Sequence, residues 1–590
     1  LAIITLSFLP VLTLEAQEGR LFAPLAYTKT WAMAAAAGLA VTLVPVLMGY
    51  VVRGSVRPEQ DNPLSRVLAA LYRPLIARVT RHPWVAVLLS AALALTAIWP
   101  AAQLGSEFMP PLDEGDWMYM PTTRPGLSIG KARELLQQTD KLIKSVPEVD
   151  TVFGKIGRAE TATDPAPLTM IETTITFKPE SEWRPGMTLE AIRDEIRQRV
   201  NLPGVTNAWV MPIKTRIDML ATGVKTPVGI KISGADLGTI QAIGRELETL
   251  LGEVPGTLSV YAERVAGGRY ITIDIDRRAA GRLGLNIADV QAVVRTAVGG
   301  MAVTETVEGL ERYPVSLRYP QHWRESPEAL RRLPIVTAAG RQVQLGDVAD
   351  IRIEEGAAVI KSENARRAGW VYIDLDQRDI GSYVAEAQRR MAESLDLPAG
   401  YALQWSGQYE YMERAKQRLQ WVVPATLAVI ALLLYLAFRS VTQALIILVT
   451  VPLALSGSVW MLYWLNYDLS VAVAVGLIAL AGVAVEIGVV MLTYLNQARA
   501  AHQASGERGP RALVAAVRDG AQRRLRPVVM TATATIAGLI PIMLSDGTGS
   551  EVMRRIAAPM VGGLVSTLVL ALVVLPAVYV LVYRRESRGG

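Results

Sequence analysis

The 590-residue chain contains no cysteine and only three histidines. Without cysteine it can form neither a disulfide nor a thiolate metal site. This absence suits an oxidising compartment. The histidines are scattered at positions 82, 322 and 502, and no HExxH or GxSxG element accompanies them. We therefore do not expect a hydrolytic enzyme.

A nucleotide-binding loop is also missing. Residues 126–131 read GLSIGK and are followed by Ala132, which departs from the Walker A spacing, so ATP is not expected to drive this chain directly. Only six phenylalanines occur, which argues against a drug-binding cleft rich in aromatic rings. The net charge of +6 is modest for this length and does not indicate a nucleic-acid partner.

Long apolar runs are abundant, and 51% of the residues are hydrophobic. About 20 apolar residues are enough to cross a bilayer. Complete transmembrane helices are predicted over residues 31–52, 84–102, 422–438, 444–465, 469–495, 528–544 and 556–582. A truncated apolar segment over residues 1–12 precedes them, and no initiator methionine or signal peptide is visible. We expect an internal fragment of a longer protein.

Arginines indicate how these helices are oriented. They gather in residues 53–81, 496–527 and 584–588, which all lie on one side if the spans alternate. The positive-inside rule makes that side cytoplasmic, although Arg554 and Arg555 fall on the other side. The large insert over residues 105–415 is then extracytoplasmic.

The insert alternates strand and helix patterns. Its first part has the order β-α-β-β-α-β of a ferredoxin-like unit, with strands at 116–121, 150–154, 170–177 and 208–212 and helices at 129–146 and 189–200. Similar patterns follow at 228–264, 270–298 and 369–405. The predicted fold class is a membrane α-helical bundle with an α+β insert of tandem ferredoxin-like (split βαβ) subdomains.

Glu486 is the one charged residue in the apolar run over residues 469–495. A carboxylate inside a membrane helix costs about 2.5–3.5 kcal/mol even on lenient insertion scales. We interpret it as a proton carrier, since proton movement is the commonest use of such a group. The alternative is a carboxylate that only bonds a neighbouring helix.

Eighteen methionines contrast with the absence of cysteine. Thioethers are soft ligands that select Cu(I) and related ions. For any single methionine, however, filling an apolar core is the stronger interpretation. Only a set that converges in the fold would indicate a metal site.

Several long motifs carry a resemblance to a known family. They are LDEGDWMYMP at residues 112–121, GRAETATDPAPLTMIETT at 157–174, RIDMLATGVKTP at 216–227, GVAVEIGVVML at 482–492 and GSEVMRRIAAPM at 549–560. In these the chain resembles the C-terminal portion of heavy-metal efflux pumps, in the copper/silver branch of the resistance-nodulation-division superfamily. The resemblance spans essentially the whole chain. It implies a proton/metal antiporter rather than an enzyme, with Cu(I) or Ag(I) as cargo and no permanently bound cofactor.

The resemblance also assigns residues. Its three-methionine metal site corresponds to Met120, Met170 and Met219, and its proton-relay glutamate to Glu486. Cleft-lining residues correspond to Glu114, Asp164, Glu172, Arg216 and Lys225. A methionine relay corresponds to Met33, Met48 and Met553.

Two positions depart from the pattern of that branch. A further relay methionine is expected at Ala302, but the methionine here is Met301. A lysine of the penultimate helix is replaced by Val528, as often in exporters of divalent cations. A divalent-cation exporter, or a membrane metal-binding or assembly module without transport, therefore remain alternatives.

The resemblance finally implies an organisation and partners. Residues 1–104 would form membrane helices with a cytoplasmic loop at 53–83, and residues 416–590 would form five more membrane helices. Between them, residues 105–225 would form a first porter subdomain, and residues 226–267 together with 361–415 a second one. Residues 268–360 would form a docking subdomain. The expected assembly is a homotrimer in the lipid of the bacterial inner membrane. A periplasmic membrane-fusion adaptor and an outer-membrane channel are the expected partners.

Overall fold

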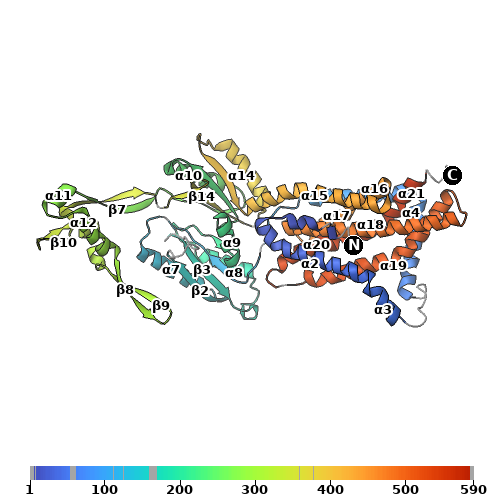
Figure 1. The fold of residues 1–590 in the computed structure, drawn as a ribbon, viewed down its shortest axis with the longest axis horizontal. Helices are drawn as coiled ribbons and strands as arrows, with labels where there is room; N and C mark the ends of the chain where they lie inside the picture. Colours follow the sequence, from blue (N-terminus) through green and yellow to red (C-terminus); the bar gives the residue numbers. More distant parts are fainter. Residues whose placement is uncertain are drawn as a thin grey trace.

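The structure, a computed structural model, describes residues 5–6, 8–52, 62–110, 112–123, 125–157, 169–357, 359–376, 378–545 and 547–584. The molecule is elongated, with a helical bundle at one end, two sheets with their covering helices in the middle, and a narrow arm at the other end (Figure 1).

Six helical segments of the described chain are long and apolar enough to cross a membrane. They are α5–α6 (Pro83–Ala101), α15 (Gln408–Phe438), α16–α17 (Val441–Trp464), α18 (Val471–Ala504), α19 (Pro510–Met543) and α20–α21 (Ser550–Tyr583). They confirm the predicted spans from residue 84 onward. Several helices are longer than the apolar runs, because turns with polar residues extend them. Helix α19, for example, begins at Pro510, well before the predicted start at residue 528, and buries Leu513 and Val517 in this extension.

The predicted span over residues 31–52 is longer and is bent. It consists of α2 (Ala16–Val41) and α3 (Leu43–Val51), which meet at Thr42 with a bend of 47°. Pro45 explains the break, because it has no N–H to donate to the carbonyl four residues earlier and its ring clashes there. Before α2, the described part of the predicted segment over residues 1–12 contains a short 3-10 helix, η1 (Leu9–Thr13), while residues 1–4 and 7 lie outside the description.

The predicted cytoplasmic loop contains an amphipathic helix that the sequence did not reveal. This helix, α4 (Pro63–Arg81), buries Tyr72, Ile76 and Val79 against the bundle. The Tyr72 hydroxyl donates to the carbonyl of Leu572 over 2.7 Å. Figure 1 shows α4 and the C-terminus at the end of the bundle remote from the sheets, which agrees with the clustering of arginines.

The two arginines that break the charge rule are both engaged. The Arg555 guanidinium lies 3.2 Å from the Glu107 carboxylate and 3.9 Å from the ring centre of Tyr467. Arg554 donates to the carbonyl of Ser545. Both arginines therefore make structural contacts at the end of the bundle that faces the sheets.

The first sheet is ferredoxin-like, as predicted. Its strands are β1 (Trp117–Tyr119), β2 (Val149–Ile156), β3 (Ile171–Phe177) and β4 (Trp209–Val210), in the order β2-β3-β1-β4. Helices α7 (Ile129–Lys144) and α8 (Leu189–Arg199) provide the crossovers. Each begins at a hydroxyl cap: the Ser128 hydroxyl accepts the backbone N–H of Lys131, and the Thr188 hydroxyl that of Ala191.

The second sheet repeats this connectivity. Its strands are β5 (Val228–Gly234), β6 (Thr257–Ala262), β14 (Arg366–Leu375) and β15 (Ala402–Gly407), with α10 (Leu237–Gly252) and α14 (Ile380–Ser394) as crossovers. Strand β14 pairs with β5 and β6, and β15 pairs with β5. A short strand, β13 (Lys361–Glu363), also pairs with β14.

The arm is inserted between β6 and β14. It begins and ends in an antiparallel ladder of β7 (Gly268–Ile275) with β12 (Ala349–Gly356), and it carries the hairpin of β8 (Met301–Glu308) and β9 (Glu311–Leu317). The predicted strand and helix within residues 270–298 are confirmed as β7 and α12 (Ile287–Val294), but β7 pairs with β12 rather than in a further ferredoxin-like sheet. The exact subdomain limits stay predictions.

Helix α9 (Pro212–Thr222) connects the two sheets and is fixed at both ends. At its start, the Glu114 carboxylate accepts the backbone N–H groups of Ile213 and Lys214, both over 2.7 Å. At its end, Gly223 adopts a φ of +79° and donates to the carbonyl of Met219 over 2.8 Å. A side chain at Gly223 would lie 2.3 Å from the Trp370 ring, so this position requires glycine.

We expect Gly223→Ala to lower the free energy of unfolding of the α/β region by about 2 kcal/mol, because the methyl group is strained at this φ and overlaps Trp370. Thermal unfolding followed by tryptophan fluorescence measures the effect. Gly204→Ala is the matched control, since Gly204 has the same φ of +79° but open space around it. Equal losses in the two variants would show that the Trp370 contact does not matter.

We expect Glu114→Ala to destabilise the first turn of α9 by about 1 kcal/mol, because two backbone N–H groups lose their acceptor. Hydrogen exchange of the α9 amides should become faster. Glu134→Ala removes only an exposed ion pair with Lys131 and serves as control. Unchanged exchange in α9 would contradict the capping role of Glu114.

Candidate functional site

The two faces of the first sheet carry different side chains. Successive residues of a strand point to opposite faces. Trp117 and Tyr119 pack in the core beneath α7 and α8. Met118 and Met120 belong to a separate cluster on the opposite face. The strand therefore presents aromatic rings to its helices and thioethers to the side where α9 lies.

The structure brings the three predicted ligand methionines together. Met120 directly follows β1 and is fully buried. Met170 directly precedes β3 and pairs with Thr122 in a β-bridge. Met219 lies in the last turn of α9. All three pack in one small apolar cluster, which we call the methionine cluster and which consists of Met118, Met120, Met170, Ala208, Val210 and Met219.

A buried lysine supports the backbone at this cluster. The Lys225 ammonium donates to the carbonyl of Met120 over 3.1 Å and to the Thr122 hydroxyl over 2.6 Å. Burial lowers the pKa of Lys225 to about 8, against the opposing charges of Glu263 and Glu172. Lys225 thus acts as a hydrogen-bond donor that holds the end of β1 in place.

The other predicted cleft residues divide by role. Glu172 is buried on β3 and pairs with Lys155 over 2.9 Å and with Arg216 over 3.4 Å. Its negative charge is thereby balanced next to Met170. Glu114 caps α9, so it positions Met219 from the far end of the helix. Asp164 lies outside the described residues.

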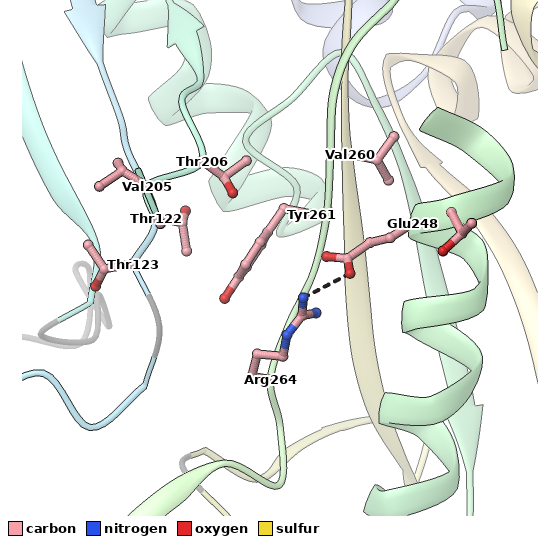
Figure 2. Close-up of a pocket in the computed structure, with 10 residues that line it drawn as sticks. Thr122, Thr123, Val205, Thr206, Glu248, Val260, Tyr261 and Arg264 are labelled. Atoms are coloured by element: carbon pink, nitrogen blue, oxygen red, sulfur yellow. Dashed lines mark hydrogen bonds and ion pairs between the residues drawn. The ribbon is translucent and has the colours of Figure 1, made fainter. Parts of the chain in front are cut away.

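A polar cavity of about 400 Å³ lies beside the methionine cluster, between the two sheets. Figure 2 shows Thr122, Thr123 and Thr206 on one side of it. On the other side, Glu248 and Arg264 form an ion pair over 2.8 Å. Thr122 belongs both to this cavity and to the Lys225 contact. The cavity offers hydroxyl and carboxylate oxygens, whereas the cluster offers sulfur.

Glu486 lies in α18, far from this site along the chain, and is half-buried between the buried Val485 and Ile487. In the part of the chain that the structure describes, no side chain pairs with its carboxylate. Val528, which occupies the position of the family lysine, is buried in α19. The proton-relay role of Glu486 stays a prediction.

The remaining predicted methionines are not part of the methionine cluster. Met33 is half-buried in α2, while Met48 and Met553 are exposed on α3 and α20. Met301 is exposed at the start of β8 in the arm, beside Ala302. Nothing in the described structure tests their role as a relay.

One methionine of the methionine cluster was missed by the sequence prediction. Met118 is 7% exposed and shares the face of Met120. The signal was present in the sequence, because the two methionines are two positions apart on a predicted strand.

Comparison with known proteins identifies the family of the chain. The sequence profile of the AcrB/AcrD/AcrF family matches residues 1–583. The chain is 52% identical over 591 aligned residues to "Cation efflux system protein CusA" of Escherichia coli K12, covering 100% of this chain and 56% of that protein. It is 51% identical to "Putative cation efflux system protein SilA" of Salmonella typhimurium, with the same coverage of both proteins. The chain therefore spans little more than half the length of these relatives.

More distant relatives and a solved structure also match. "Cobalt-zinc-cadmium resistance protein CzcA" of Cupriavidus metallidurans is 35% identical over 99% of this chain and 55% of its own length. A crystal structure of a heavy metal efflux pump superposes with a TM-score of 0.85 at 32% identity, covering 98% of this chain and 56% of that one. The chain belongs to the AcrB/AcrD/AcrF family of the resistance-nodulation-division superfamily, and within it is similar to the heavy-metal efflux pumps.

Proposed function

We propose that this chain is part of a proton-driven pump that exports Cu(I) or Ag(I) and holds the ion at Met120, Met170 and Met219. The observation that carries the proposal is the convergence of these residues, 49 or more positions apart in the sequence, in one cluster. Thioether sulfur selects soft ions, whereas zinc-like divalent ions are usually bound through nitrogen, oxygen or thiolate. The names of the CusA and SilA relatives support a cation as cargo.

Proton coupling is the second part of the proposal. In this proposal Glu486 takes up a proton on one side of the membrane and releases it on the other, so that its two protonation states favour two helix arrangements. One proton that crosses about 100 mV supplies roughly 2.3 kcal/mol, and each pH unit adds about 1.4 kcal/mol. Together these support a concentration ratio of a few hundred.

Alternation between two states would open and close the space between the two sheets. Strand β15 runs directly into α15, so the second sheet is attached to a membrane helix without a linker. A shift of α15 would move this sheet relative to the methionine cluster. The polar cavity between the sheets would then be the path by which the ion reaches or leaves the sulfur atoms.

The arm supports assembly with further copies of the chain in the inner membrane. Every residue of β8 and β9 is exposed, and Leu310 at the tip is completely so. A two-stranded hairpin is marginally stable on its own, so contact with another copy would stabilise it. We propose the homotrimer, with an adaptor and an outer-membrane channel, as the working assembly.

Two other functions can be distinguished from the proposed Cu(I)/Ag(I) export. A divalent-cation exporter is favoured by Val528 and by the 35% identity to CzcA, but it gives the gathered thioethers no function. A metal-binding module without transport explains the methionines but leaves the charged Glu486 in α18 without a use.

We expect replacement of Met120, Met170 and Met219 together by Ile to lower Ag(I) affinity at least 100-fold, because the sulfur donors are lost while apolar volume is kept. Isothermal titration on the purified chain measures this. Met187→Ile is the control, since Met187 packs on the helix-covered face of the same sheet. Unchanged Ag(I) affinity in the triple variant would assign the three methionines to core packing.

We expect Glu486→Gln to abolish proton-driven export while Ag(I) affinity stays within twofold, because amide nitrogen cannot titrate and the metal site is remote. Transport is measured in proteoliposomes that hold the complete pump under an imposed pH gradient. Glu486→Asp keeps a titratable carboxyl and should retain part of the activity. Full export by the Gln variant would refute the proton role.

A further inference from the structure

Met118 is the fourth methionine of the methionine cluster, and no family motif assigns it a role. It is buried on the central strand of the first sheet. Its side chain packs with Met120, Met170 and Met219 rather than with the aromatic core on the other face. Four methionines therefore share one cluster where three were expected.

The strand register fixes the position of Met118. Its backbone pairs with Thr174 of β3 on one side and with Val210 of β4 on the other. Met120 is held just beyond the strand by its N–H, which donates to the carbonyl of Ala208 over 2.9 Å. Residues two apart on a strand are separated by about 6.6 Å and point to the same face. Methionine is long and has three rotatable bonds, so two such sulfurs can reach one point between them.

The other groups beside the cluster offer nitrogen or oxygen rather than sulfur. Lys225 is a hydrogen-bond donor and offers no lone pair while it is charged. The Thr122 hydroxyl accepts from Lys225, and Glu172 pairs through Oε2 with Lys155 and Arg216. Oxygen donors suit hard ions, whereas thioethers suit soft ones. Among the described residues of the methionine cluster, Met118 supplies the one further sulfur.

We propose that Met118 is a fourth thioether ligand, which completes a tetrahedral all-sulfur site for a soft monovalent ion. This inference rests on the proposed function of the other three methionines. Four neutral sulfurs would exclude water and hard oxygen ligands from the ion. The site would therefore discriminate more strongly against divalent ions than a three-methionine site.

X-ray absorption at the silver edge tests the proposal on the full purified chain loaded with one equivalent of Ag(I). We expect four sulfur neighbours in the unaltered chain and three in Met118→Leu, a change that keeps the apolar volume. Ag(I) affinity should fall roughly tenfold in this variant, as when a supporting metal contact is lost. Met187→Leu, on the opposite face of the sheet, should change neither value.

The outcomes separate the two proposals. Three sulfur neighbours in the unaltered chain would overturn the role of Met118 and leave the three-methionine site intact. An unchanged affinity in Met118→Leu would also overturn it. No Ag(I) binding by the unaltered chain would overturn both. The sulfur count of the unaltered chain decides the matter even if Met118→Leu fails to fold.

Discussion

The pairing of β1 between β3 and β4 is the constraint on which the methionine cluster depends. Side chains alternate along this strand, so the register decides which ones face α9. A slip by one residue would turn Trp117 and Tyr119 toward the cluster and both methionines toward α7 and α8. The stacked pair of Trp117 and Trp209, with ring centres 4.4 Å apart, helps to prevent this slip by anchoring the aromatic face.

Helix α9 and Lys225 position Met219 relative to the first sheet. The cap at Glu114 and the turn at Gly223 hold the helix of Met219 between the two sheets. Lys225 lies in the segment between α9 and β5, and its hydrogen bond to Thr122 links that segment to the chain just after β1. The second sheet then continues into α15 and the membrane. Contiguous, hydrogen-bonded elements thus join the bundle to the cluster.

Local patterns predicted much of this fold. Amphipathic periodicity located α7 and α8, alternation located β3, and apolar runs located the membrane helices, because each signal lies within one segment. The bend at Thr42 could have been predicted from Pro45. Helix α4 was missed because its residues lie between arginines that were interpreted only as a topology signal.

The site was harder to predict because it is assembled from distant segments. No local pattern shows that Met170 and Met219 meet Met120, and the family resemblance was needed to select these three among eighteen methionines. The capping role of Glu114 also depends on a contact 99 positions along the chain. Met118, by contrast, was recoverable from strand alternation alone.

We propose that the sulfur-lined face of the first sheet, and not the oxygen-lined cavity beside it, binds the exported ion. Anomalous diffraction from crystals of the chain soaked in Ag(I) distinguishes the two locations. We expect one strong silver peak enclosed by the side chains of the methionine cluster. A silver peak in the cavity of Thr122 and Glu248, with none among the methionines, would contradict it.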